Sequence, residues 1–382
     1  MNEAPHHPWV NGWRILCARP DNLGDVLMTT PAFRALKTSF PDCHLTLLTS
    51  SAGRAVAGLI PDIDEVITFD LPWVKTDQTP TDPQALFEIV HTLRAGRFDA
   101  AVVFTVQSQN PLPMAMLCYM AQIRRVLGYC RENPYHLLTN WVPDPEVLVA
   151  TRHEVTRQLD LVGAIGATTA NERLSLRIPP EAPAQARQLL HKVGLDRTRP
   201  WILLHAGVSE EKRRYPAGQF AEVGRQLTAQ GIQVGLTGSP DEQPYAQLIR
   251  EQIGSGAFNL AGTLPLPAFC ALVADAPVLL SNNTGPVHIA AAVGTPVVVA
   301  YAKTNPQHTP WMVPNRVLYM DVPPFLRSRN VLLQQFPEPA LPKATPAGLA
   351  NAVCELIGDR WSALALNTNR IAQPIDLQPT TF

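Results

Sequence analysis

The chain has 382 residues, of which 46% are hydrophobic and 16% are charged, and its formal net charge at pH 7 is −1. This length is too great for one ordinary hydrophobic core and suits two domains of about 150 to 200 residues each. The near-zero charge gives no reason to expect nucleic acid or a membrane surface as a general partner.

The first half of the sequence alternates short apolar runs with segments of helical periodicity. We predict strands at residues 14–18, 45–49, 66–69, 100–105 and 125–129, and helices at residues 26–37, 53–60, 83–93, 113–121 and 152–164. Prolines interrupt residues 133–149, which are predicted to be irregular. Strands that alternate with helices at this spacing indicate a parallel, doubly wound α/β sheet.

The same alternation begins again after a linker near residues 176–182. Strands are predicted at residues 201–205, 232–236, 258–260, 277–280 and 296–301, and helices at residues 183–193, 216–229, 244–253, 267–274 and 346–357. We therefore predict an N-terminal Rossmann-like domain over residues 1–178 and a C-terminal one over residues 179–358, facing each other across a central cleft. Residues 359–382 are predicted to be a tail that is disordered from Asn367.

The segment 281–301, SNNTGPVHIAAAVGTPVVVAY, has the pattern of a polar turn, a short helix and a strand. Asn283 and Thr284 are favourable N-cap residues, and Pro286 suits the first helical turn. A helix that begins at the carboxyl edge of a parallel sheet offers an anion site, which His288, one turn later, would also reach. The alternative is an ordinary capped helix.

Gly24 and Asp25 lie directly after the first strand. Glycine allows a close backbone approach, and a carboxylate is favourable in the first turn of a helix. In a cleft, Asp25 would be placed to act as a general base toward an attacking hydroxyl group. The alternative is that it only complements the helix dipole. The loop contains no G-x-G-x-x-G motif, which disfavours a nicotinamide or flavin dinucleotide.

Two further polar segments follow neighbouring strands of the second half. His205 and Gly207 precede three consecutive cations at residues 212–214, which would neutralise a diphosphate leaving group unless they form only a solvated loop. Gly238 and Glu242 follow the next strand, where a carboxylate suits the hydroxyl pair of a ribose. An acidic first helical turn explains Glu242 equally well.

Other sequence features bear on metal binding, on the state of the cysteines and on the location of the protein in the cell. The histidines show no metal-binding spacing, so we expect no metal site and no cofactor. The six cysteines are scattered without a C-x-x-C pair, which indicates reduced core residues. With no apparent signal peptide and no apolar run of about 20 residues, we expect a cytoplasmic protein with at most peripheral contact at the inner face of the cytoplasmic membrane.

Four segments in this order resemble glycosyltransferase family nine, the heptosyltransferase family of lipopolysaccharide core assembly. They are RPDNLGDVLMTTPAFRAL, KRRYP, GSPDE and SNNTGPVHIAAAVGTPVVVAY, and the resemblance extends from residue 14 to about residue 317. It implies the GT-B fold, with the donor bound mainly to the second domain and the acceptor to the first. It also implies an inverting, metal-independent transfer of heptose from a nucleotide-diphosphate sugar, typically ADP-heptose, to a hydroxyl of a glycan or lipid-linked glycan.

The resemblance assigns roles to individual residues. Asp25 would be the general base, Lys212 or Arg213 would hold the diphosphate, Glu242 the ribose, and Thr284, Gly285 and His288 the phosphates. Gly24, His205, Gly207, Gly238 and Asn283 complete the predicted donor site.

Two positions depart from the family pattern. Asn283 stands where many relatives carry aspartate; the amide is expected to keep the N-cap hydrogen bond while it removes a negative charge near the donor. Counted back from Pro216, the family's lysine falls on Arg213, with Lys212 one residue earlier. These departures leave open a catalytically idle nucleotide-sugar-binding protein or a GT-B-type epimerase. A plain interaction module is disfavoured, because four polar strand-end motifs converge on one cleft.

Overall fold

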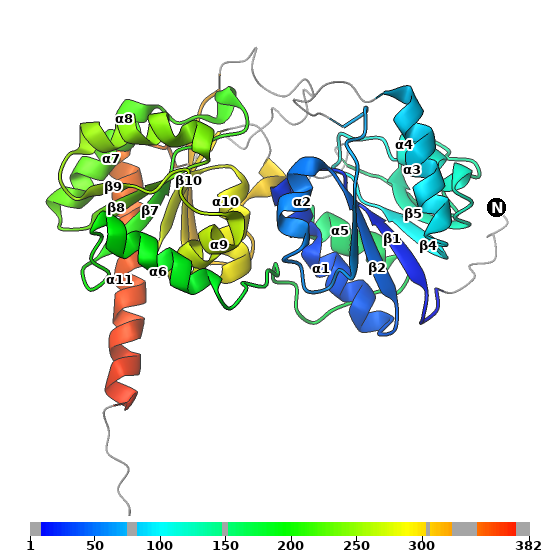
Figure 1. The fold of residues 1–382 in the computed structure, drawn as a ribbon, viewed down its shortest axis with the longest axis horizontal. Helices are drawn as coiled ribbons and strands as arrows, with labels where there is room; N and C mark the ends of the chain where they lie inside the picture. The colour runs from blue at the N-terminus through cyan, green and yellow to red at the C-terminus, as the bar shows by residue number, and fades with distance from the viewer. Residues whose placement is uncertain (1–8, 75–81, 147–151, 303–305, 323–341, 372–382) are drawn as a thin grey trace, which may run out of the picture.

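The computed structural model contains two α/β domains side by side (Figure 1). It describes residues 9–74, 82–146, 152–302, 306–322 and 342–371, and of the side chains in the last range those up to residue 358. Each domain is built on a six-stranded sheet in which all neighbouring strands run parallel. The predicted doubly wound architecture is confirmed.

The N-terminal sheet has the strand order β3-β2-β1-β4-β5-β6. Its strands are β1 (Arg14–Ala18), β2 (His44–Thr49), β3 (Glu65–Thr68), β4 (Ala100–Val103), β5 (Arg125–Cys130) and β6 (Asn140–Pro143). Its helices are α1 (Leu23–Ser39), α2 (Ser51–Ala57), α3 (Pro83–Ala95), α4 (Leu112–Met120) and α5 (Glu154–Gly163).

The C-terminal sheet has the order β12-β11-β10-β7-β8-β9. Its strands are β7 (Trp201–His205), β8 (Gln233–Thr237), β9 (Ala257–Asn259), β10 (Leu279–Asn282), β11 (Val297–Ala302) and β12 (Asn315–Met320). Its helices are α6 (Ala182–Val193), α7 (Ala217–Ala229), α8 (Gln243–Ile253), α9 (Leu266–Asp275), α10 (Gly285–Val293) and α11 (Pro346–Ile371), with the short 3₁₀ helices η1 (Glu211–Arg213), η2 (Pro240–Glu242) and η3 (Pro306–His308).

Both faces of each sheet are buried, which explains why the central strands are continuous apolar runs. In β1, Ile15 and Cys17 belong to one hydrophobic core, and Leu16 and Ala18 belong to another on the opposite face. The first core continues through α1 and α10 into the second domain, where it includes Leu203. The two domains are therefore joined by apolar packing. All six cysteines are free, and five of them are buried.

The strand orders place a topological switch point in the middle of each sheet. The chain moves outward from β1 to β2 and β3, then returns to β4 on the other side of β1, and β7 and β10 are related in the same way. In sheets of this kind, ligands bind outside the carboxyl ends of the strands at the switch point. The loops after β1, β4, β7 and β10 are thus the positions at which a ligand is expected.

The structure corrects three predictions about the edges of the molecule. Residues 140–143, predicted to be irregular, form the parallel edge strand β6, where Pro143 is tolerated because an edge strand need not donate on both sides. The edge strand β12 was not predicted. Helix α11 extends past the predicted residues 346–357 to Ile371, so the first part of the predicted tail is helical. Residues 372–382 lie outside the described part of the chain.

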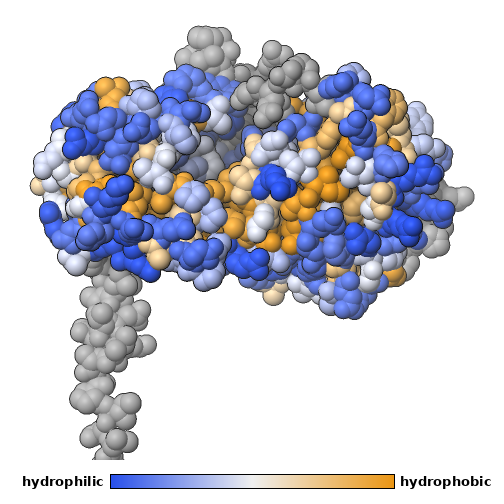
Figure 2. All heavy atoms as spheres, in the orientation of Figure 1, coloured by the Kyte–Doolittle hydropathy of each residue, from blue (hydrophilic) through white to orange (hydrophobic). Residues whose placement is uncertain are grey.

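On the face shown in Figure 2, hydrophilic residues cover much of both domains, and apolar residues gather in a band across the middle. None of the helices in the described residues combines the length and the apolar character needed to span a bilayer.

Candidate active site

The N-termini of α1 and α10 meet at the junction between the domains. A Cβ atom added at Gly24 would lie 2.7 Å from the ring atom Cδ2 of His288, and one at Gly285 would lie 3.3 Å from Leu23 Cδ2. Both glycines therefore permit a close approach that a larger residue would disturb. The loop after β1 and the loop after β10, both predicted to be functional, are brought together.

Asp25 lies in the first turn of α1, and 17% of its side chain is exposed. Burial raises the pKa of its carboxyl group; the guanidinium groups of Arg19 and Arg213 oppose this rise, and the carboxylate of Glu154 adds to it. A general base is most efficient when its pKa lies near the pH at which the enzyme works, and a raised carboxyl pKa is closer to that pH. The location and electrostatics of Asp25 are compatible with the predicted role.

Arg19 is completely buried among three carboxylates. Its Nε lies 3.2 Å from Asp21 Oδ2, and its Nη2 lies 2.7 Å from Glu154 Oε1 and 3.5 Å from Asp25 Oδ1. One cation cannot neutralise three anions, and burial raises the pKa of both Asp21 and Glu154 while Arg19 opposes the rise. This cluster was not predicted from the sequence. Arg19 stood in a quoted motif, but Glu154 lies 135 residues away from it.

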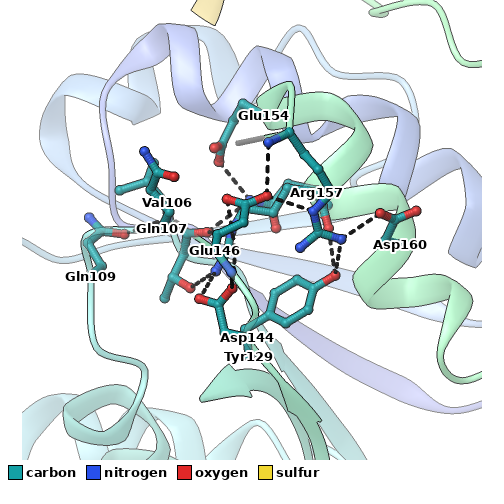
Figure 3. Close-up of polar contacts among 12 residues, drawn as sticks. Val106, Gln107, Gln109, Tyr129, Asp144, Glu146, Glu154, Arg157 and Asp160 are labelled. Carbon is teal, nitrogen blue, oxygen red and sulfur yellow. Dashed lines mark hydrogen bonds and ion pairs between the residues drawn. The ribbon is translucent and has the colours of Figure 1, made fainter. Parts of the chain in front are cut away.

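Figure 3 shows that Glu154 belongs to a larger polar network between α5 and the ends of the neighbouring strands. Gln158 Nε2 donates to Glu154 Oε1 at 2.7 Å. Arg157 donates to both carboxylate oxygens of Asp144 at 2.9 and 3.0 Å, and its Nε donates to the carbonyl of Thr105 at 2.9 Å. These bonds fix α5 to the sheet, and they fix the orientation of Glu154 toward Arg19.

Three histidines surround the junction, and burial lowers the pKa of each. The pKa of His288 falls to about 3, with His153 and Arg213 adding to the effect of burial, and that of His308 is also well below its usual value. These imidazoles are therefore neutral near pH 7. His288 Nδ1 is buried and has no hydrogen-bond partner among the described residues, so a ligand at this point would find an unused ring nitrogen.

The loop after β7 is tied to the end of β10 by Asn282. Its Oδ1 accepts from the backbone N–H of Tyr215 at 2.9 Å, and its Nδ2 donates to the carbonyl of Ala206 at 2.8 Å. The expected role of Asn283 as a helix cap is wrong. Asn283 Oδ1 instead accepts from the N–H of Ala302 at 3.1 Å, and the N-cap residue of α10 is Thr284, which makes no capping bond with its side chain.

His205, Gly207, Gly238 and Glu242 come together at the ends of β7 and β8. Glu242 Oε2 accepts from the N–H of Ser239 at 2.8 Å in a capping box. A Cβ atom at Gly207 would collide with the Glu242 carboxylate. His205 is neutral because burial lowers its pKa against the opposing charge of Glu242. The structure is compatible with both interpretations of Glu242. Its carboxylate caps a short helix, and it lies at the sheet edge where a ribose was predicted to bind.

The cationic loop contains one residue that acts across the junction. Lys212 and Arg213 both pair with Glu210, at 2.8 and 3.2 Å. The charge of Arg213 lowers the pKa of Asp25 and of His288, and its side chain is 18% exposed. Of the two candidates for holding a diphosphate, Arg213 is thus the one whose charge acts on Asp25 and His288.

Comparisons with known proteins identify the family of the chain. Residues 86–324 match the model of glycosyltransferase family 9 (heptosyltransferase). The chain is 25% identical over 316 residues to lipooligosaccharide heptosyltransferase 2 of Haemophilus influenzae, an alignment that covers 78% of this chain and 85% of that protein.

Two solved structures have the same fold. A family 9 glycosyl transferase from Veillonella parvula superposes with a TM-score of 0.74 and 22% identity over 92% of this chain and 99% of that chain. The ADP-heptose lipopolysaccharide heptosyltransferase II of E. coli superposes with a TM-score of 0.68 and 22% identity over 91% and 99% of the two chains. They confirm the predicted GT-B type fold.

Proposed function

Because the chain belongs to glycosyltransferase family 9, we propose that this glycosyltransferase moves heptose from ADP-heptose to a hydroxyl group of a lipopolysaccharide-core-like glycan. The relatives named for heptosyl transfer and for ADP-heptose support this choice of sugar and donor. The observation that supports the mechanism is the position of Asp25, which directly follows Leu23 and Gly24 where they approach α10 and which is within the electrostatic influence of Arg213.

In the proposed reaction, Asp25 accepts the proton of an acceptor hydroxyl group. The acceptor oxygen attacks the anomeric carbon from the face opposite the nucleotide, the bond from this carbon to the diphosphate oxygen breaks, and ADP leaves with the bonding electron pair. Attack opposite the leaving group inverts the anomeric configuration. The negative charge that develops on the diphosphate is stabilised by the helix N-terminus at Thr284 and Gly285 and by Arg213.

We assign the remaining donor contacts to the C-terminal domain. Glu242 would bind the ribose hydroxyls, while Gly207 and Gly238 leave room beside its carboxylate. The neutral ring of His288 would donate a hydrogen bond to a phosphate oxygen. A fixed cation and a helix N-terminus place positive potential where the leaving group forms, and we therefore propose that the transfer needs no metal ion. Among the described residues, no group of three potential metal ligands lies close enough together to hold one.

We also propose a cytoplasmic site of action, with peripheral contact at the inner face of the membrane when the acceptor is lipid-linked. No role for nucleic acid is proposed.

The experiment is incubation with ADP-heptose and a core oligosaccharide, with ADP release followed with and without EDTA. In Asp25→Asn, we expect turnover to fall by about 10²–10⁴-fold while the Kd for ADP-heptose is unchanged. The control is Asp42→Asn, which removes an exposed carboxylate just beyond the opposite end of α1. Unchanged turnover in Asp25→Asn would exclude the base, and loss of activity with EDTA would exclude the metal-free mechanism. Tight donor binding without turnover would indicate a nucleotide-sugar-binding protein instead, and an epimerised donor without ADP release would indicate an epimerase.

A further inference from the structure

A pocket of about 180 Å³ opens at the switch point of the N-terminal sheet. Its wall is formed by Pro20 from the loop after β1, by Thr105 from the loop after β4, and by Trp73, which follows β3. Ser108, Gln109 and Asn110 contribute polar atoms. Because it lies at the carboxyl ends of β1 and β4, it occupies the position where open parallel sheets bind ligands. None of the residues proposed to bind the donor lines it.

The lining indicates the chemistry of the ligand. None of the described residues that line the pocket is charged, so this part of the lining holds no group that would neutralise a phosphate or a carboxylate. Instead, a tryptophan that is 36% exposed stands beside amide and hydroxyl groups. A neutral sugar ring has this combination of surfaces, with an apolar C–H face and a rim of hydroxyl groups. The volume is below the ~300–1,000 Å³ of pockets for drug-sized ligands, which suits a single ring.

The amide groups are already held in position by protein partners. Gln109 Nε2 donates to Asp21 Oδ1 at 2.6 Å, and its Oε1 accepts from the N–H of Val106 at 3.0 Å. Asn110 Nδ2 donates to Glu132 Oε1 at 2.9 Å, and its Oδ1 accepts from the N–H of Leu112 at 2.9 Å. An amide has two donor hydrogens and two acceptor lone pairs. Each side chain thus keeps one donor and one acceptor in a fixed orientation for a ligand.

The pocket is connected to the proposed base by a short chain of contacts. Gln109 binds Asp21, Asp21 pairs with Arg19 Nε at 3.2 Å, and Arg19 Nη2 reaches Asp25. Pro20 lies in the loop between β1 and α1, and Asp25 lies in the first turn of α1. A ring in the pocket would therefore lie at the same edge of the sheet as the group that must receive the acceptor's proton.

We propose that this pocket binds one neutral sugar ring of the acceptor glycan, with Trp73 packed against the apolar face of the ring. The inference rests on the proposed function and extends it, because it states the charge class and the size of the acceptor unit that is recognised.

Saturation-transfer NMR with simple glycosides tests the proposal without any turnover. The probes are methyl α-mannopyranoside, the corresponding methyl heptoside and, as an acidic comparison, methyl mannuronoside. We expect the two neutral glycosides to receive saturation from the wild-type protein, and the acidic one much less. Trp73→Ala should reduce this transfer about fivefold or more, whereas Trp73→Phe should retain most of it. The control is Phe87→Ala, which removes an aromatic ring that is 60% exposed on α3 and outside the pocket.

Calorimetric titration with ADP is run on every variant and reports both folding and the donor site. Unchanged ADP affinity in Trp73→Ala, together with loss of glycoside binding, supports the proposal. The proposal is overturned if the neutral glycosides do not bind, if their binding survives Trp73→Ala, or if the acidic glycoside binds best. Weaker ADP binding in Trp73→Ala would overturn it in favour of a nucleotide-binding pocket. If the wild-type protein does not turn over ADP-heptose, this result counts against the proposed function. The glycoside-binding result can still be interpreted, because it does not depend on turnover.

Discussion

Replacing Glu154 with glutamine tests whether a buried carboxylate controls the protonation of Asp25. Arg19 Nη2 lies 2.7 Å from Glu154 Oε1 and 3.5 Å from Asp25 Oδ1. The two carboxylate oxygens are therefore at most about 6 Å apart, the sum of those distances. Glutamine has nearly the same shape, and its oxygen can still accept from Arg19. The substitution thus removes a charge and leaves the hydrogen bond in place.

The size of the effect follows from the distance. Two unit charges about 6 Å apart at an effective dielectric constant of about 20 interact by roughly 3 kcal/mol, equivalent to about two pH units. Asp25 is 17% exposed and Arg19 lies between the charges, so we expect about half of this, on the order of one pH unit. Glu154 raises the pKa of Asp25. Its neutralisation should lower that pKa, and Asp25 should remain deprotonated and active at lower pH.

The assay is the pH dependence of kcat/KM for ADP release, whose acid limb reports the essential base of the free enzyme. In Glu154→Gln this limb should move to lower pH. The matched control is Glu146→Gln, because Glu146 is also buried and pairs with Arg152 at 2.6 Å in the same network; its limb should not move. An unmoved limb in Glu154→Gln would mean that Glu154 carries a proton throughout the working range or does not act on Asp25, and the reasoning would be refuted.

Two further substitutions test the junction. Arg213→Met should weaken ADP binding about tenfold through loss of a charge-assisted contact, whereas Lys212→Met should change it less than about twofold; calorimetry that gives the opposite order would assign the diphosphate to Lys212. Gly24→Ala places a Cβ atom 2.7 Å from the His288 ring, so it should separate α1 from α10 and lower kcat about tenfold or more with little change in the ADP Kd. Wild-type kcat in this variant would show that the close approach is dispensable.

The arrangement of strands could be predicted from the sequence wherever the strands are buried on both faces. Apart from Arg14 at the start of β1 and His205 at the end of β7, the residues of these two strands are apolar, and their predicted bounds agree with the structure. β6 and β12 are edge strands whose residues are largely half-exposed or exposed. The sequence of β6, NWVP, has no apolar run of strand length, whereas β12 contains the short apolar run Val317–Met320, which was not predicted to be a strand.

Residues of the candidate site could be predicted only where a chemically suitable side chain lies directly after a predicted strand. Asp25 and His288 follow strands in recognisable segments, and the structure places α1 against α10 as the fold class implies. The hydrogen bond that Ala302 N–H donates to Asn283 spans 19 residues, and the pair of Arg19 with Glu154 spans 135 residues. Neither pairing has a local pattern, because the partner is determined by how the elements pack.

The electrostatics of the junction suggest how donor binding prepares the base. The charge of Arg213 lowers the pKa of Asp25, so Asp25 is a weaker base in the free protein than its burial alone would make it. A diphosphate bound to Arg213 would offset this positive charge, and the basicity of Asp25 should then increase. The acid limb of kcat at saturating donor should accordingly lie at higher pH than that of kcat/KM for the donor. If the two limbs coincide, Arg213 does not transmit donor binding to the base. If they separate, one arginine both holds the leaving group and keeps the base weak until a donor is present.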